Sequence, residues 1–251
     1  MRHGLVSLMM ASASGVVGFI GGDIQTYDPT TSDITVDLTS LTDGLASSPS
    51  TGDLVIVVFG VEANGNADFS SAIADGWTTR IEHYVNSTYD TNVVIAYKVM
   101  GALVDTALTI YGGTSAFGRP GIAMVQVWRG VDVNSIIAPM NVSSSTGSIL
   151  ANPPAPYASP SNPDSFQLVF AVGADNESVV ETYSSSFFDG LFASDGKGHE
   201  GGFGGDQSVV GAHGWKTWVN GDDNPPAFTY SGASSAANSY LAYTIILEPE
   251  V

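Results

Sequence analysis

The chain has 251 residues, no cysteine, and a formal charge of −18 from 25 acidic and seven basic side chains. A surface this negative repels phosphate backbones and anionic lipid headgroups, so we expect neither nucleic-acid binding nor membrane insertion. Without cysteine there is no disulfide framework and no thiolate chemistry. The length suits one large β domain, and a hydrophobic content of 43% is enough for a substantial core.

Residues 1–32 are Gly-rich and apolar before they end in a polar Thr/Asp/Pro stretch. The first 14 residues loosely imitate a signal peptide, but Gly4 and Ser7 interrupt the apolar run. We therefore expect residues 1–32 to be an N-terminal attachment arm, ahead of one domain over residues 33–251. The apolar side chains expected to make the attachment are Leu5, Val6, Leu8, Phe19 and Ile20.

Strand patterns dominate the rest of the chain. Asp33–Leu41 alternates apolar and polar residues, as a half-buried strand does, whereas Leu54–Val61 is continuously apolar, as a strand covered on both faces is. The last strand is predicted to place Leu241, Tyr243, Ile245 and Leu247 on one face. The further predicted strands are Thr91–Met100, Ala107–Tyr111, Ile122–Trp128, Phe166–Val172 and Ser239–Leu247.

Two later stretches interrupt this rhythm of strands and turns. Residues 133–164 hold six prolines, which predicts a long loop that crosses between sheets. Residues 189–214 hold nine glycines, which predicts a loop too flexible for regular sheet. We find no clean internal repeat, although each half has a Gly-Trp pair after a long apolar strand. Many short strands with turns between them predict an all-β fold, a jelly-roll-like antiparallel β-sandwich.

Catalytic motifs are missing from the sequence. There is no G-x-S-x-G motif, and the four histidines lack the spacing of a metalloprotease motif. We interpret His83 as a structural residue within a strand, which leaves His213 as the one histidine worth testing. Paired carboxylates for glycoside cleavage need only be close in space, so with 25 acids the sequence does not decide for or against them. We predict no catalytic residue, and a glycan-degrading enzyme stays an alternative.

Two Gly-rich regions offer candidate binding residues. Asp222, Asp223 and Asn224 supply the oxygen ligands that Ca²⁺ requires, although we favour solvated turn residues as their explanation. No other cofactor is expected. Exposed aromatic rings beside polar groups can bind sugars, and the same residues can instead fill a core. The predicted glycan-binding residues are Trp215, Trp218, His213, Phe203 and Tyr230.

Four short motifs in this order resemble a family of jelly-roll-like proteins found in tailed bacteriophages and phage-like particles. They cover residues 50–132 well, residues 165–249 are similar more loosely, and residues 1–32 are not covered. The closing segment Ser239–Pro249 is also similar to the last strand of that family. The four motifs are Gly52–Ile56, Gly76–Thr78, Ala96–Val99 and Trp128–Asp132.

The resemblance implies a virion structural protein on the surface of an extracellular particle. It would be a head or tail spike, fibre or decoration protein, a homo-oligomer that contacts other virion proteins through the N-terminal arm. Two functions follow: a spike or fibre subunit that contacts host surface polysaccharide, or a capsid-stabilising decoration protein without receptor binding. The motifs carry over no catalytic residue. Gly52 and Asp53 would open a strand through a tight turn, and Arg129 would hold loop carbonyls or a carboxylate such as Asp132.

Overall fold

The computed structural model describes residues 17–27, 33–63, 65–66, 76–110, 120–137, 140–156, 159–160, 162–175, 183–196, 208–218, 224–231 and 238–250. Strands predominate among these residues, and the one helix that they include is short. In this part of the chain no helix is long and apolar enough to cross a membrane. The expected all-β antiparallel sandwich is confirmed, with two large sheets packed against each other.

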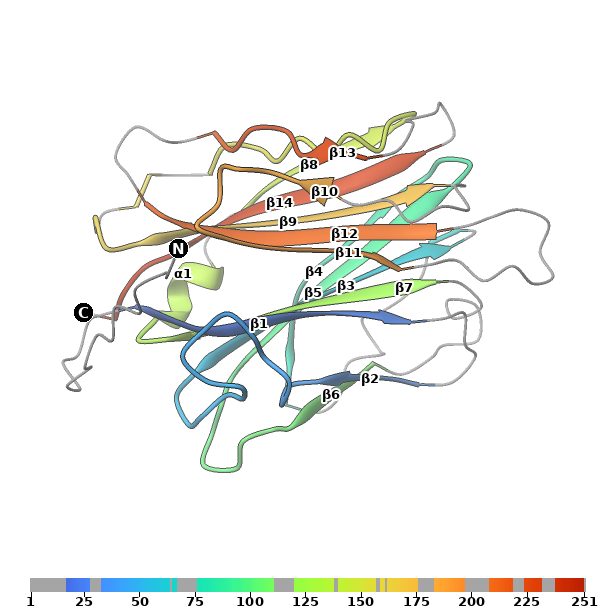
Figure 1. The fold of residues 1–251 in the computed structure, drawn as a ribbon. Coiled ribbons are helices and arrows are strands. Elements are labelled where there is room, and N and C mark those ends of the chain that lie inside the picture. The colour runs from blue at the N-terminus through green and yellow to red at the C-terminus, as the bar shows by residue number, and fades with distance from the viewer. Residues whose placement is uncertain are drawn as a thin grey trace, which may run out of the picture.

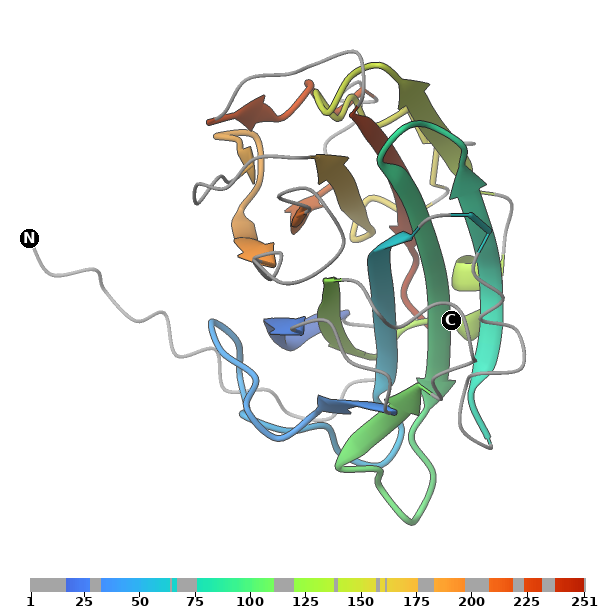
Figure 2. The same cartoon turned by 90° about the vertical axis from the view of Figure 1, so that its right-hand side faces the viewer.

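The first half of the chain builds one five-stranded sheet and a two-stranded cover. Its strands are β1 (Gly18–Tyr27), β2 (Ile34–Asp37), β3 (Leu54–Ala63), β4 (Thr78–Val85), β5 (Asp90–Val99), β6 (Ala107–Ile110) and β7 (Gly121–Arg129). The large sheet has the order β1-β7-β3-β5-β4, and all neighbours are antiparallel. β2 pairs with β6, and this pair lies at the bottom of the molecule in both ribbon views (Figure 1, Figure 2).

The second half builds the opposite sheet and a second cover. After helix α1 (Val133–Ile137) come β8 (Asn141–Thr146), β9 (Phe166–Asp175), β10 (Tyr183–Ser184), β11 (Gly190–Gly196), β12 (Ser208–Thr217), β13 (Thr229–Tyr230) and β14 (Ser239–Leu247). The sheet has the order β11-β12-β9-β14-β8, again antiparallel throughout. β10 pairs with β13 in the upper part of Figure 1.

The two sheets repeat one strand order. Each half places its opening strand at one edge, then its closing strand, then its long central strand, then an antiparallel pair: β1-β7-β3-β5-β4 and β8-β14-β9-β12-β11. The covers β2–β6 and β10–β13 correspond as well, except that β2 precedes its central strand and β10 follows it. The molecule resembles a jelly roll in having two sheets packed face to face. It differs in its connections, because each half of the chain completes one sheet by itself.

Three apolar clusters hold these layers together. The inner cluster joins the two large sheets, with Ile56 and Val58 of β3 on one side and Phe170 and Val172 of β9 on the other. A second cluster packs the outer face of the first sheet under β2 and β6, and a third packs the outer face of the second sheet under β10 and β13. Because successive side chains of a strand point to opposite faces, β3 and β9 are apolar at nearly every position.

The faces of two predicted strands are confirmed. Leu241, Tyr243, Ile245 and Leu247 of β14 all lie in the inner cluster. β2 buries Ile34 and Val36 and exposes Thr35, as the alternation of its sequence indicates. Both patterns follow from the period of two along a strand, which is a local property of the sequence.

The prediction of an irregular, flexible loop over residues 189–214 is wrong for its described part. Residues 190–196 form β11 and residues from 208 onward form β12, while 197–207 lie outside the described residues. A Cβ atom at Gly211 would lie 2.8 Å from Cδ1 of Ile122, and one at Gly214 would lie 2.7 Å from Cγ of Phe188. These glycines permit close packing of a strand, which composition does not distinguish from flexibility.

The loop predicted over residues 133–164 is partly corrected. The chain crosses here from the first sheet to the second, but the segment also contains α1 and the edge strand β8. The sequence of β8, NVSSST, is polar and alternates partly buried with exposed side chains. Its polarity suits an edge strand and hides it from a search for apolar runs.

The attachment arm is also corrected in its described part. Phe19 and Ile20 lie in β1, an edge strand of the first sheet, and their side chains are 9% and 1% exposed. Phe19 packs in the inner cluster, and Ile20 packs in the cluster on the outer face of the first sheet. Both side chains therefore stabilise the sandwich and are not available to contact another protein. Leu5, Val6 and Leu8 lie outside the described residues.

Candidate functional site

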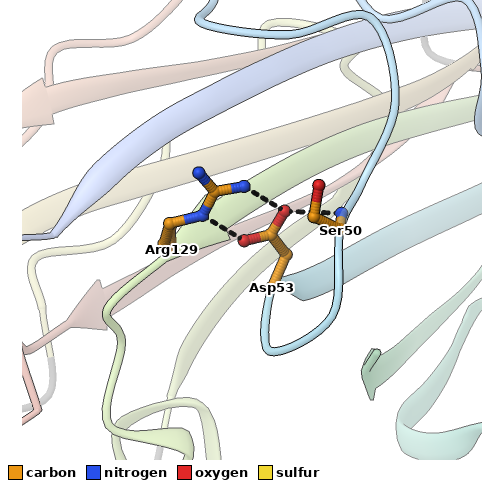
Figure 3. A network of polar contacts seen from close by, with 3 residues as sticks. All are labelled: Ser50, Asp53 and Arg129. Atoms are coloured by element: carbon orange, nitrogen blue, oxygen red, sulfur yellow. Dashed lines mark hydrogen bonds and ion pairs between the residues drawn. The ribbon is translucent and has the colours of Figure 1, made fainter. Parts of the chain in front are cut away.

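Two of the four motifs meet in an ion pair between a buried carboxylate and a half-exposed guanidinium (Figure 3). Nε and Nη2 of Arg129 donate to the two carboxylate oxygens of Asp53, at 2.7 and 3.0 Å, and the Ser50 N–H donates to the same carboxylate at 2.7 Å. The Asp53 side chain is fully buried, whereas that of Arg129 is 51% exposed. The hydrogen bonds to Asp53 raise the pKa of Arg129. This clamp ties the start of β3 to the end of β7.

The structure agrees with the tight turn predicted at Gly52 and corrects the predicted partner of Arg129. Gly52 has a φ of +87° in the turn before β3, so the tight turn predicted there is present. The carboxylate that Arg129 binds is Asp53, which replaces the predicted Asp132. Asp132 instead accepts a hydrogen bond from the Asn134 N–H at 2.9 Å, at the start of α1. The motif residues thus act as determinants of the fold.

The predicted glycan-binding residues do not form an exposed platform. Trp218 and Tyr230 are each only 7% exposed. Trp215 is partly buried and packs its ring against the rings of Phe19 and Trp128, with centroids 5.2 and 5.8 Å away. Phe203 lies outside the described residues. The core-packing alternative explains the three described aromatic residues.

His213 is a buried member of a hydrogen-bond chain between the sheets. The indole N–H of Trp128 donates to Oε1 of Gln126 at 3.0 Å, and Nε2 of Gln126 lies 3.0 Å from Nδ1 of His213. Nε2 of His213 lies 3.0 Å from the carbonyl oxygen of Asp23 in β1. Since the Gln126 amide nitrogen can only donate, His213 accepts at Nδ1 and donates from Nε2. Burial lowers the pKa of His213 to about 3, so the imidazole is neutral and structural at neutral pH.

The predicted calcium site has one described residue. Asn224 is exposed, and Asp222 and Asp223 lie outside the described residues. Among the residues that the structure does describe, no group of three or more His, Asp or Glu side chains is placed to hold a metal ion.

A polar hollow beside β4 is the candidate binding site. It has a volume of about 460 Å³, is open to solvent, and its described lining residues are Asn66, Glu82, His83 and Tyr84. Three of these are consecutive residues of β4, the edge strand of the first sheet, and Asn66 follows the end of β3. The volume lies within the range of ordinary small-ligand sites.

Asp90, at the start of β5, organises the walls of this hollow. Its carboxylate is 4% exposed and accepts three hydrogen bonds. The Tyr84 hydroxyl donates to Oδ2 at 3.1 Å, the Gly65 N–H to the same oxygen at 2.7 Å, and the Ser87 N–H to Oδ1 at 2.6 Å. Partial burial and the bond to Asp90 raise the pKa of Tyr84. One carboxylate therefore fixes both the Tyr84 ring and the turn that carries Asn66.

His83 is held from the opposite sheet. Its ring stacks on that of Tyr243 in β14, with centroids 5.7 Å apart and an interplanar angle of 20°, and the Tyr243 hydroxyl lies 3.3 Å from Nδ1. Burial raises the pKa of Tyr243 well above its usual value and lowers that of His83, so a neutral phenol and a neutral imidazole share this hydrogen bond. This agrees with a structural histidine.

The hollow is suited to binding a ligand. It is poorly suited to acid–base catalysis by Glu82 and His83. Glu82 and His83 are adjacent in a strand, so their side chains leave opposite faces and do not form an acid–base pair. Sequence reasoning missed this site because its described lining residues come from two separate segments, and Asp90, which holds them, comes from a third. The one local signal was the turn sequence at residues 64–66, which marks a turn without indicating what lies beside it.

No protein-family model matches the chain, and neither a curated protein nor a solved structure matches it. The family resemblance therefore rests on the short sequence motifs alone.

Proposed function

We propose that this protein is an outward-facing structural subunit of a phage or phage-like particle, a spike or fibre subunit that contacts host surface glycan. The observation that carries the proposal is the Asp53–Arg129 clamp. Asp53 and Arg129, which belong to two different motifs and lie 76 residues apart in the sequence, meet in one bidentate pair whose carboxylate is buried. Related surface proteins that bind different ligands would be expected to share the residues that determine their fold, and these two residues do so here.

A second candidate function is a decoration protein that stabilises the capsid without binding a receptor. The burial of Trp218, His213 and Tyr230 favours it, because the aromatic residues predicted to bind glycan are used in packing. Both candidate functions place the protein on the surface of the particle. They differ in whether the subunit contacts the host.

Particle incorporation tests the proposal. The full chain, carrying an epitope tag at its C-terminus, is expressed with the particle genes of its source, and particles are purified on a density gradient. We expect the chain to sediment with intact particles and the tag antibody to decorate them in electron micrographs. A chain that stays at the top of the gradient, or a tag reached only after disruption of the particles, would overturn the proposal.

A further inference from the structure

We propose that the hollow beside β4 binds an uncharged, hydroxyl-rich ligand, the chemistry of a neutral sugar residue. The inference rests on the proposed function, since it names the site through which the subunit would contact glycan. It moves that site from the residues around Trp215 to Asn66, Glu82 and Tyr84.

The lining groups supply a mixture of donors and acceptors. The Asn66 amide offers both, and the Glu82 carboxylate accepts. The Tyr84 hydroxyl gives its proton to Asp90, which leaves its oxygen as an acceptor toward the ligand. Vicinal sugar hydroxyls donate and accept together, so they match such a set better than a purely acidic or purely basic ligand does.

An aromatic ring completes the chemistry expected of a sugar site. Tyr84 is partly exposed in β4, with its hydroxyl anchored at its far end. The face of an aromatic ring carries negative charge density, which attracts the weakly positive C–H groups on one side of a sugar ring. Tyr84, which lines the hollow, therefore supplies an aromatic ring as well as an acceptor.

The hollow is held in shape before any ligand arrives. The Asp90 carboxylate fixes Tyr84 and Gly65, and the side-chain amide of Asn92 donates to the Gly65 carbonyl at 3.2 Å. Asn66 follows directly after this fixed residue. A site whose walls are fixed by buried hydrogen bonds loses less conformational entropy on binding.

Charge sets the ligand class. The protein carries a formal charge of −18, and Glu82 lines the hollow, so anionic sugars are repelled. Asp90 is buried and does not line the hollow, so Glu82 is the one acidic side chain among the described lining residues. A neutral ligand meets no charge repulsion there, and glucosamine in the test below distinguishes it from a cationic ligand.

Binding to the isolated full-length chain tests this inference. The probes are glucose, galactose, mannose and N-acetylglucosamine at millimolar concentration, with N-acetylneuraminic acid and glucosamine as the charged comparators. Saturation-transfer NMR reports binding. We expect at least one neutral sugar to bind, and Tyr84→Ala and Asn66→Ala each to weaken it by about tenfold, which corresponds to roughly 1.4 kcal/mol. Thr35→Ala, at an exposed position on β2, is the control and leaves binding unchanged.

Asp90→Asn tests the positioning role, and Tyr84→Phe, which removes only the hydroxyl, serves where Asp90→Asn fails to fold. Both should weaken binding of the same sugar. Three results would overturn the inference: no neutral sugar binds, a charged comparator binds instead, or the β4 variants bind as well as Thr35→Ala does. Each of these leaves particle incorporation untouched, so failure of the sugar site and failure of the proposed function are distinguishable.

Discussion

Arg129 stabilises the fold by compensating the buried charge of Asp53. Substituting Arg129→Met removes the guanidinium and leaves a fully buried carboxylate that keeps the hydrogen bond from the Ser50 N–H. We expect a loss of about 2–3 kcal/mol in the free energy of unfolding, below the roughly 3–5 kcal/mol of a fully buried pair because Arg129 is half exposed. Denaturant unfolding measures the loss.

A matched substitution elsewhere controls for the lost charge. Lys98→Met removes the partner of Asp105, an ion pair at 2.6 Å in which both side chains retain solvent contact. Such a pair contributes up to about 1 kcal/mol, so this variant should be clearly more stable than Arg129→Met. Equal losses in the two variants would contradict the structural role given to the motif residues.

His213 makes stability depend on pH. Its pKa is about 3 in the folded protein, against the ordinary 6.5 of an exposed histidine in the unfolded chain. Between these values the unfolded chain binds a proton that the folded chain does not. Stability is therefore greatest above pH 6.5 and falls as the pH drops below it, by about 1.4 kcal/mol per pH unit from this residue.

The non-titrating variant His213→Gln isolates this effect. Between about pH 7 and pH 5, the unfolding free energy of the unsubstituted protein should fall by roughly 2 kcal/mol more than that of the variant. The comparison of slopes removes the contribution of His83, whose pKa is also lowered by burial. Parallel pH profiles for the two proteins would show that the buried imidazole does not control this behaviour.

At the level of elements, the central strands of the two sheets pack closely because of a glycine. A Cβ atom at Gly60 of β3 would lie 2.5 Å from Cγ1 of Val172 in β9. Gly60→Ala should therefore destabilise the protein by about 1–3 kcal/mol through overpacking. Gly101→Ala, with nothing within 4 Å of the added atom, should change stability by no more than about 0.5 kcal/mol.

A second substitution can restore the space between these strands. Val172→Ala removes Cγ1 and Cγ2, the two atoms closest to the new Cβ, so the double variant should lose less stability than the sum of the two single variants. A favourable coupling of about 1 kcal/mol, measured in a double-mutant cycle by denaturant unfolding, is expected. Strict additivity would mean that the sheets do not approach as described at Gly60.

The sequence predicts those elements whose signal is local. β3 and β14 follow from runs and alternation of apolar residues, and both are confirmed. β8, β11 and β12 escape such a search because polar or Gly-rich strands look like loops when composition alone is considered. β8 and β12 pair with strands far away in the sequence, whereas β11 pairs with β12, the next strand along the chain. These pairings decide their structure, and local composition does not.

Contacts between distant segments explain the errors at the candidate sites. Proximity in sequence pairs Arg129 with Asp132, but Arg129 binds Asp53, 76 positions earlier. His213 and Trp218 lie beside Gly-rich sequence, which suggests exposure, and the sandwich buries both. The hollow beside β4 depends on Asp90 contacting two other segments, which no spacing rule predicts.

Across the whole molecule, two successive halves with one strand order share a single inner core. Each half supplies one sheet, and Ile56 and Phe170 from different halves lie in the same cluster. The repeat is visible in the order of the strands and not in the sequence. The two halves are therefore joined into one sandwich by the apolar side chains that face each other across the sheets.

Adsorption to host cells tests the central claim of an outward-facing subunit that contacts glycan. Particles with and without this chain are compared on host cells before and after periodate oxidation of the surface sugars. We predict that particles with the chain adsorb to untreated cells, and that either removal of the chain or oxidation of the sugars lowers adsorption. Equal adsorption with and without the chain would contradict this account, and reduced heat resistance of the chain-free particles would then identify a decoration protein.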